Sequence, residues 1–85
     1  MSQASESRIT QLVGAIRLYL SQHADAADDE HGIAAWWLPS MGLQASRDEV
    51  AQALERLHGI GIVARCRLPD GRMIYRARLD EHPCS

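Results

Sequence analysis

The stretch from Ser46 to Leu79 constrains the fold of this chain most. It contains the pattern of an amphipathic helix with an N-terminal capping signal, followed directly by the pattern of a tight hairpin. Ser46 stands three residues before Glu49, which is the spacing of a capping box, where each side chain accepts a hydrogen bond from the backbone N–H of the other residue. Gly59 is expected to end the helix in a left-handed conformation. The apolar residues between these signals recur at helical spacing: Val50, Ala53, Leu54 and Leu57. The pattern predicts a helix with one buried face.

Two runs that alternate with period two follow this helix, Ile62 to Leu68 and Arg72 to Leu79. Pro69-Asp70-Gly71 joins them and supplies turn chemistry: a fixed φ, a carboxylate that can accept from the local backbone, and a residue that tolerates positive φ. We expect Arg65 and Arg67 to share a face of the hairpin with the arginines of the second run. The sequence therefore predicts four to five arginines on one side of a two-stranded ribbon.

The chain has a formal net charge of −2, but its positive charge is concentrated in the half that contains this hairpin. Residues 1–50 carry seven acids and three arginines, a net charge of −4, whereas residues 51–85 carry four acids and six arginines, a net charge of +2. Binding of a charged partner depends on the local field of a patch more than on the total charge. All nine basic residues are arginine, a side chain suited to bidentate phosphate contacts.

A first helix is predicted over residues 8–22, with a buried stripe at helical spacing that comprises Ile9, Leu12, Val13, Ile16 and Leu20. The opposite side has no charged residue among Gln11, Gly14, Ala15 and Leu18, and two of these residues are small, which is unusual for a side that faces solvent. Two interpretations of this side remain open. Leu18 is either an isolated exposed leucine, which is normal on protein surfaces, or part of a helix-to-helix homodimer contact that Gly14 and Ala15 allow to approach closely.

A short second helix is predicted over residues 32–38, ending before Pro39 because the residue that precedes proline is disfavoured in the α region. Asp25 or Asp28 is available as its N-cap. Ile33, Trp36 and Trp37 stand at i, i+3 and i+4, and we expect both tryptophans to anchor this helix in the core. The alternative for the tryptophan pair is ligand or base stacking. The acids at 28–30 are interpreted as partners of the positive helix end.

Length and composition bound the domain organisation. With 85 residues, the chain is expected to form one domain over residues 8–79, with a disordered segment at 1–7 and a tail at 80–85. Its two cysteines, Cys66 and Cys84, form neither a closely spaced metal pair nor a disulfide framework, which favours the reducing cytoplasm. No signal peptide or membrane span is indicated.

The order of helix, helix, capped helix and arginine-rich hairpin resembles the winged helix-turn-helix superfamily of small bacterial transcription regulators. The resemblance covers residues 8–79 and is most specific from Leu54 to Val63 and at the Leu68-Pro69-Asp70-Gly71-Arg72 tip. It implies a mainly α fold, a three-helix core plus a C-terminal β-hairpin wing, and a homodimeric regulator of transcription that binds double-stranded DNA. The implied groove contacts are Gln44, Ser46, Arg47, Gln52 and Arg56, and the implied wing contacts are Arg65, Arg67, Arg72, Arg76 and Arg78.

Other interpretations stay open. In one alternative, the arginine face pairs internally with the acids of residues 25–30 or with the tail acids Asp80 and Glu81. Asp48 and Glu55 share the outer face of the third predicted helix with Gln52 and Arg56, and a carboxylate near a phosphate is repulsive unless it is paired. The alternative function is therefore a winged-helix module that binds a protein instead of DNA. The histidines at 23, 31, 58 and 82 lack metal-ligand spacing, and no phosphate loop or catalytic triad is recognisable, so we expect neither an enzyme nor a metal or cofactor.

Overall fold

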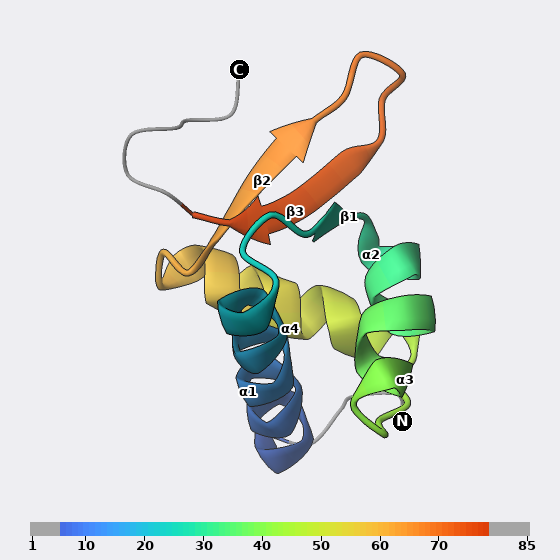
Figure 1. The fold of residues 1–85 in the computed structure, drawn as a ribbon, viewed down its shortest axis with the longest axis vertical. Helices are drawn as coiled ribbons and strands as arrows, with labels where there is room; N and C mark the ends of the chain where they lie inside the picture. Colours follow the sequence, from blue (N-terminus) through green and yellow to red (C-terminus); the bar gives the residue numbers. More distant parts are fainter. Residues whose placement is uncertain (1–5, 79–85) are drawn as a thin grey trace.

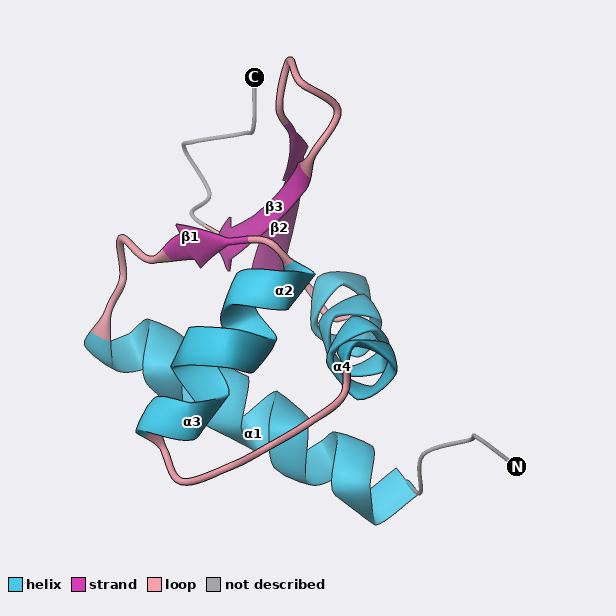
Figure 2. Ribbon diagram, turned by 90° about the vertical axis from the view of Figure 1, so that its right-hand side faces the viewer, coloured by secondary structure: helices cyan, strands magenta, loops and turns pink. Residues whose placement is uncertain are grey.

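The computed structural model describes residues 6–78 and consists of packed helices and a small antiparallel sheet at one end of them (Figure 1). In chain order the elements are α1 Glu6–Gln22, β1 Ala27–Asp28, α2 Glu30–Gly32, η1 Ile33–Trp37, α3 Leu38–Ser40, α4 Arg47–Gly59, β2 Val63–Arg67 and β3 Met73–Ala77. The three short helical segments from Glu30 to Ser40 follow one another without a break. The hairpin of β2 and β3 rises beyond α4 and away from α1 (Figures 1 and 2).

One core joins the helices to the base of the hairpin. Its side chains come from α1, the segment from η1 to α3, α4, β2 and β3. The fully buried larger residues are Leu12, Ile16, Ile33, Leu38, Leu54, Leu57, Val50 and Val63. The predicted buried stripe of the third helix is confirmed, because Val50, Ala53, Leu54 and Leu57 of α4 are all in this cluster.

Helix α1 begins at Glu6, two residues before the predicted start. The expected stripe is confirmed for Ile9, Leu12, Ile16 and Leu20. Val13 is only partly buried, whereas Ala15 is buried in the core. The assignment of Ala15 to a dimer surface is therefore wrong, since the packed face of α1 is wider than the stripe of large side chains suggested.

The segment between the first two predicted helices contains a strand, β1, that the sequence did not predict. Ala27 pairs with Arg76 and Asp28 with Tyr75, so β1 lies along the outer edge of β3 and the sheet order is β1-β3-β2. Figure 2 shows this third strand beside the hairpin. A strand of two residues has no alternation of its own to detect, and its hydrogen bonds depend on a partner far along the chain.

The second helical region starts and ends differently from the prediction. Asp29 is the N-cap, and its carboxylate accepts a hydrogen bond from the Gly32 N–H at 2.8 Å. Helical structure also continues through Pro39 to Ser40, instead of ending before the proline. Just before Pro39 the Leu38 N–H donates to the Ile33 carbonyl, five residues back, which makes a wider π turn. This wider turn accommodates the proline ring and its missing N–H.

The two adjacent tryptophans have opposite environments. Trp37 is 4% exposed and stacks on Tyr19 of α1, with ring centroids 4.5 Å apart and an interplanar angle of 11°. Trp36 is 70% exposed. Core anchoring is thus confirmed for Trp37 and wrong for Trp36, because neighbouring positions of one helix turn point in different directions.

Helix α4 has the predicted start but a different end. The Ser46 hydroxyl accepts from the Glu49 N–H at 3.2 Å, and the Glu49 carboxylate accepts from the Ser46 N–H at 3.0 Å, which confirms the capping box. The left-handed residue is Gly61, with φ of 81°, and not Gly59. The Gly61 N–H donates to the His58 carbonyl and the Ile62 N–H donates to the Leu57 carbonyl. These two hydrogen bonds form a Schellman motif.

Alanine substitutions at these two glycines are expected to have opposite effects on stability. Gly61→Ala places a Cβ in the left-handed region and is expected to destabilise the protein by about 1–2 kcal/mol. Gly59→Ala is the matched control, because its position is helical and no atom lies within 4 Å of the added Cβ. We expect this variant to be neutral or more stable, by up to about 1 kcal/mol. Urea denaturation of both variants tests the assignment, and a loss of stability confined to Gly59→Ala would contradict it.

The register of the hairpin differs from the prediction by one residue. Val63 pairs with Ala77, Arg65 with Tyr75 and Arg67 with Met73. The Leu68 N–H also donates to the Arg72 carbonyl, so the loop is the three-residue segment Pro69-Asp70-Gly71, with Gly71 at φ 95°. A type I turn followed by a left-handed residue forms this kind of loop. Odd-numbered residues of both strands therefore share a face, and the predicted gathering of all wing arginines on one face is wrong.

The state of Cys66 bears on the predicted compartment. Cys66 on β2 is disulfide-bonded, and Cys84, the chain's only other cysteine, lies outside the described residues. The expectation of reduced cysteines is wrong in this structure, so a cytoplasmic location loses that argument and stays a prediction. Within residues 6–78, no helix has both the length and the apolar composition needed to cross a bilayer.

Candidate nucleic-acid interface

The exposed face of α4 has a polar strip along its centre. Asp48, Gln52 and Glu55 stand at i, i+4 and i+7, opposite the buried face of the helix, and all three are exposed. The first two turns also contribute Ala51, which is partly buried beside the strip. The centre of the exposed face thus carries two carboxylates and one amide.

Arginines flank this strip on both sides. Arg47 lies toward α2, with its Nη2 atom 3.8 Å from Oε1 of Glu30. Arg56 lies toward α1, with its Nη1 atom 2.5 Å from Oε2 of Glu6. The hydrogen bond from Arg56, with its positive charge, lowers the pKa of Glu6, and the same hydrogen bond raises the pKa of Arg56. The flanks of α4 are therefore basic, although each arginine has a carboxylate partner.

The hairpin adds two arginines above α4. Arg65 and Arg67 share the face of Val63 and Tyr75, which are buried against the helices. From this face the Arg65 Nη1 atom reaches Oε1 of Glu55 on α4 at 3.3 Å. Arg67 lies two residues nearer the tip, is exposed, and makes no ion pair with any residue in the 6–78 range. The helix-facing side of the hairpin is thus basic where it extends beyond the core.

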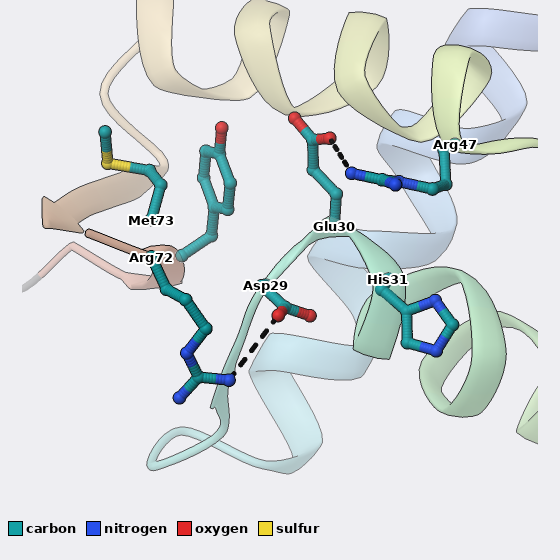
Figure 3. Close-up of a pocket in the computed structure, with 7 residues that line it drawn as sticks. Asp29, Glu30, His31, Arg47, Arg72 and Met73 are labelled. Carbon is teal, nitrogen blue, oxygen red and sulfur yellow. Dashed lines mark ion pairs between the residues drawn. The ribbon is translucent and has the colours of Figure 1, made fainter. Parts of the chain in front are cut away.

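A cavity of about 490 Å³ lies where the hairpin, α2 and the start of α4 meet. Two ion pairs line it, Arg47 with Glu30 and Arg72 Nη1 with Asp29 Oδ2 at 3.6 Å (Figure 3). The Nε atom of Arg72 also lies 3.4 Å from Oδ2 of Asp70 in the turn. The pKa of Asp29 is lowered, first by the hydrogen bond from Gly32 N–H and further by the positive charge of Arg72. These contacts link the tip of the hairpin to the N-terminus of α2.

Arg76 and Arg78 lie on the other face of the sheet. Arg76 stands opposite Ala64 on β2 and Ala27 on β1, and it is partly buried. Arg78 is exposed just after β3. The structure therefore divides the five wing arginines between two faces and brings only Arg65, Arg67 and Arg72 toward α4 and α2.

The remaining predicted groove residues lie at the start of α4. Ser46 caps the helix, and its hydroxyl is already engaged by the Glu49 N–H. Gln44 is exposed in the preceding loop, and its backbone carbonyl accepts a hydrogen bond from Arg8. Both residues neighbour Arg47 in the chain, so they extend the exposed N-terminal end of α4 without adding charge.

The acids of residues 25–30 were among the predicted partners of the hairpin arginines, and Asp29 does pair with Arg72, whereas the partners of Arg56 and Arg47 were not identified from the sequence. Glu6, Glu30 and Asp29 come from segments 17–50 positions away from Arg56, Arg47 and Arg72, respectively. No local spacing rule connects residues so far apart. Glu55, already noted as an outer-face acid, is neutralised by Arg65. Asp48 makes no ion pair within the described part of the chain.

The side of α1 that was predicted to form a homodimer contact is largely exposed. Gln11, Gly14 and Leu18 are exposed on α1, with Leu18 50% exposed, so three of the four proposed dimer residues remain on the surface. Among residues 6–78, no group of three or more histidine, cysteine, aspartate or glutamate side chains is placed to hold a metal ion.

Comparisons of the chain with models of protein families, with curated proteins and with solved structures found no match.

Proposed function

We propose that this chain is a winged helix-turn-helix domain that binds double-stranded DNA, with α4 in the major groove and the hairpin of β2 and β3 as the wing. A helical core that carries a small antiparallel sheet is compatible with this architecture. The proposed contacts are those predicted residues that border the exposed face of α4: Gln44, Ser46, Arg47, Gln52, Arg56, Arg65, Arg67 and Arg72.

The observation that carries this proposal is the arrangement of arginines around α4. Arg47 and Arg56 flank its exposed face on opposite sides, Arg65 reaches Glu55 on that face from the hairpin, and Arg67 shares the sheet face of Arg65. An α-helix with its side chains is about 10–12 Å across, and the major groove is about 12 Å wide. A helix seated in the groove therefore points its central strip at the base edges and its flanks at the two phosphate backbones.

The ion pairs of Arg47 and Arg56 are compatible with DNA binding because each has a well-exposed member. Arg47 is 71% exposed beside Glu30 at 29%, and Glu6 is 75% exposed beside Arg56 at 39%. Ion pairs open to solvent contribute only about 0–1 kcal/mol each. A phosphate offers the planar guanidinium of arginine a charged partner that it can bind through two hydrogen bonds. At Arg47 and Arg56 the exchange of a carboxylate for a phosphate thus costs little, and counterion release from the DNA favours it.

Transcription regulation and a homodimer are part of the same proposal. A domain of this size contacts few base pairs, and a symmetric dimer doubles the contact set by binding two half-sites. The exposed side of α1 around Leu18 is the proposed contact between the protomers, now without Ala15.

A salt titration of binding to a mixed-sequence duplex tests DNA binding. If five arginines contact phosphates, the logarithm of the association constant should fall with the logarithm of salt concentration with a slope of about −4 to −5 per protomer. Fluorescence anisotropy between 50 and 200 mM salt measures this slope. An absence of binding at low salt, or an affinity indifferent to salt, would contradict the proposal.

A protein-binding module is the second candidate, favoured by a specific observation. Trp36 is 70% exposed, and tryptophan is enriched in protein interfaces. Four of the proposed contact arginines also have internal carboxylate partners, which reduces the positive potential of the surface. Capture of a protein partner that depends on Trp36, together with no retardation of DNA at low salt, would favour this candidate.

A further inference from the structure

We propose that Glu55, positioned by Arg65, selects a cytosine in the bound DNA by accepting a hydrogen bond from the cytosine N4 amino group. This inference rests on the proposed function, since it requires α4 to lie in the major groove. It assigns a role to a residue that is otherwise expected to weaken DNA binding.

Glu55 lies at the centre of the exposed face, between the flanking arginines. Its side chain is 73% exposed and stands two turns after Asp48 along the same strip. In a helix seated in the groove, the centre of this face is directed at base edges, while Arg47 and Arg56 lie nearer the two backbones. The Glu55 carboxylate is therefore separated from the phosphates by positively charged groups.

The contact with Arg65 orients this carboxylate. Arg65 Nη1 donates to Glu55 Oε1 at 3.3 Å, and no other residue in the described chain forms an ion pair or side-chain hydrogen bond with Glu55. One carboxylate oxygen thus retains its accepting capacity, and the positive charge of Arg65 offsets the negative charge of the group. Arg65 acts as a positioning residue, and its four remaining N–H donors stay available for a phosphate.

The chemistry of an ionised carboxylate points to cytosine among the four bases. A carboxylate only accepts hydrogen bonds, and cytosine presents the N4 amino donor in the major groove. Guanine presents two acceptors there, and thymine presents an acceptor and a methyl group. Adenine presents a donor next to the N7 acceptor, which repels a carboxylate. Glu55 is expected to favour cytosine by about tenfold at one position of the site.

Asp48 provides a matched control on the same strip. It is an exposed carboxylate like Glu55 but has no arginine partner in the part of the chain that the structure describes. Its direction is not fixed, so it is expected to repel phosphates without selecting a base. Asp48→Asn should therefore raise affinity evenly across sequences, whereas Glu55→Gln should change the preferred base.

Selection of duplexes from a randomised pool, with sequencing of the bound fraction, tests the inference. The unmodified chain should enrich cytosine at one position, and Glu55→Gln should shift that position toward adenine, because glutamine pairs with adenine N6 and N7. Arg65→Ala should lose the cytosine preference. Arg67→Ala, on the same face of the hairpin but without a carboxylate partner among residues 6–78, should bind more weakly and keep the preference.

The outcomes separate this inference from the proposed function. If no duplex is retained at low salt, DNA binding fails and the inference fails with it. If duplexes are retained without a cytosine preference, or if Glu55→Gln raises affinity evenly across all sequences, DNA binding stands and the role of Glu55 is overturned. Circular dichroism of each variant checks that the change has not unfolded the domain.

Discussion

Replacing Trp37 with alanine should lower the free energy of unfolding by about 3–5 kcal/mol, the cost of removing a large buried aromatic side chain. Trp37 is 4% exposed, and its ring stacks on Tyr19 of α1. The contact joins the π-helical segment to the first helix, so its loss leaves a cavity between two elements that otherwise hold the core together. Domains of this size are often only about 5 kcal/mol stable, and much of the variant population should be unfolded.

Trp36→Ala is the matched control for this prediction. The residue type and the change are identical, but Trp36 is 70% exposed, so the free energy of unfolding should change by less than about 0.5 kcal/mol. Urea denaturation followed by far-ultraviolet circular dichroism avoids dependence on tryptophan fluorescence. Equal losses of stability in the two variants would refute the assignment of Trp37 alone to the core.

A double variant, Arg47→Ala with Arg67→Ala, should reduce the salt dependence of DNA binding by a slope of about 2, since each lost phosphate contact contributes about 0.9. These residues lie at the flank of α4 and on the helix-facing side of the hairpin. Neither is in the buried core. Removal of phosphate contacts should weaken binding to all sequences by a similar factor, because phosphates carry no base information.

The control for this variant removes the same charge elsewhere. Arg17 is exposed on α1, and Arg78 is exposed after β3 in the register of the opposite sheet face. Arg17→Ala with Arg78→Ala should leave the slope nearly unchanged. Anisotropy titrations of both double variants measure the salt-dependence slope of DNA binding. Equal reductions of the slope in the two variants would show that net charge alone, and not this surface, governs binding.

A difference of one residue between the predicted and the observed register of the hairpin changes which arginines face α4. The strands and the turn were predicted at nearly their observed positions, but the assumed pairing joined even-numbered residues of one strand to odd-numbered residues of the other. The observed three-residue loop joins residues of equal parity. Arg65 and Arg67 consequently face α4, whereas Arg76 lies on the other side of the sheet.

Sequence by itself determined the features that depend on a few neighbouring residues. The capping box of Ser46 and Glu49, the buried stripe of α4 and the Pro69-Asp70-Gly71 turn are all present, because each arises from side chains within one or two turns of the backbone. The central location of Asp48 and Glu55 on the exposed face follows from the same helical periodicity.

The tertiary structure alone decided which distant groups meet. It added β1 to the sheet, placed Glu6 beside Arg56 and joined Arg65 to Glu55. It also buried Trp37 while leaving Trp36 exposed. Such contacts depend on packing angles and strand register, in which a shift of a single residue reverses a face, and no pattern within a short stretch of sequence contains that information.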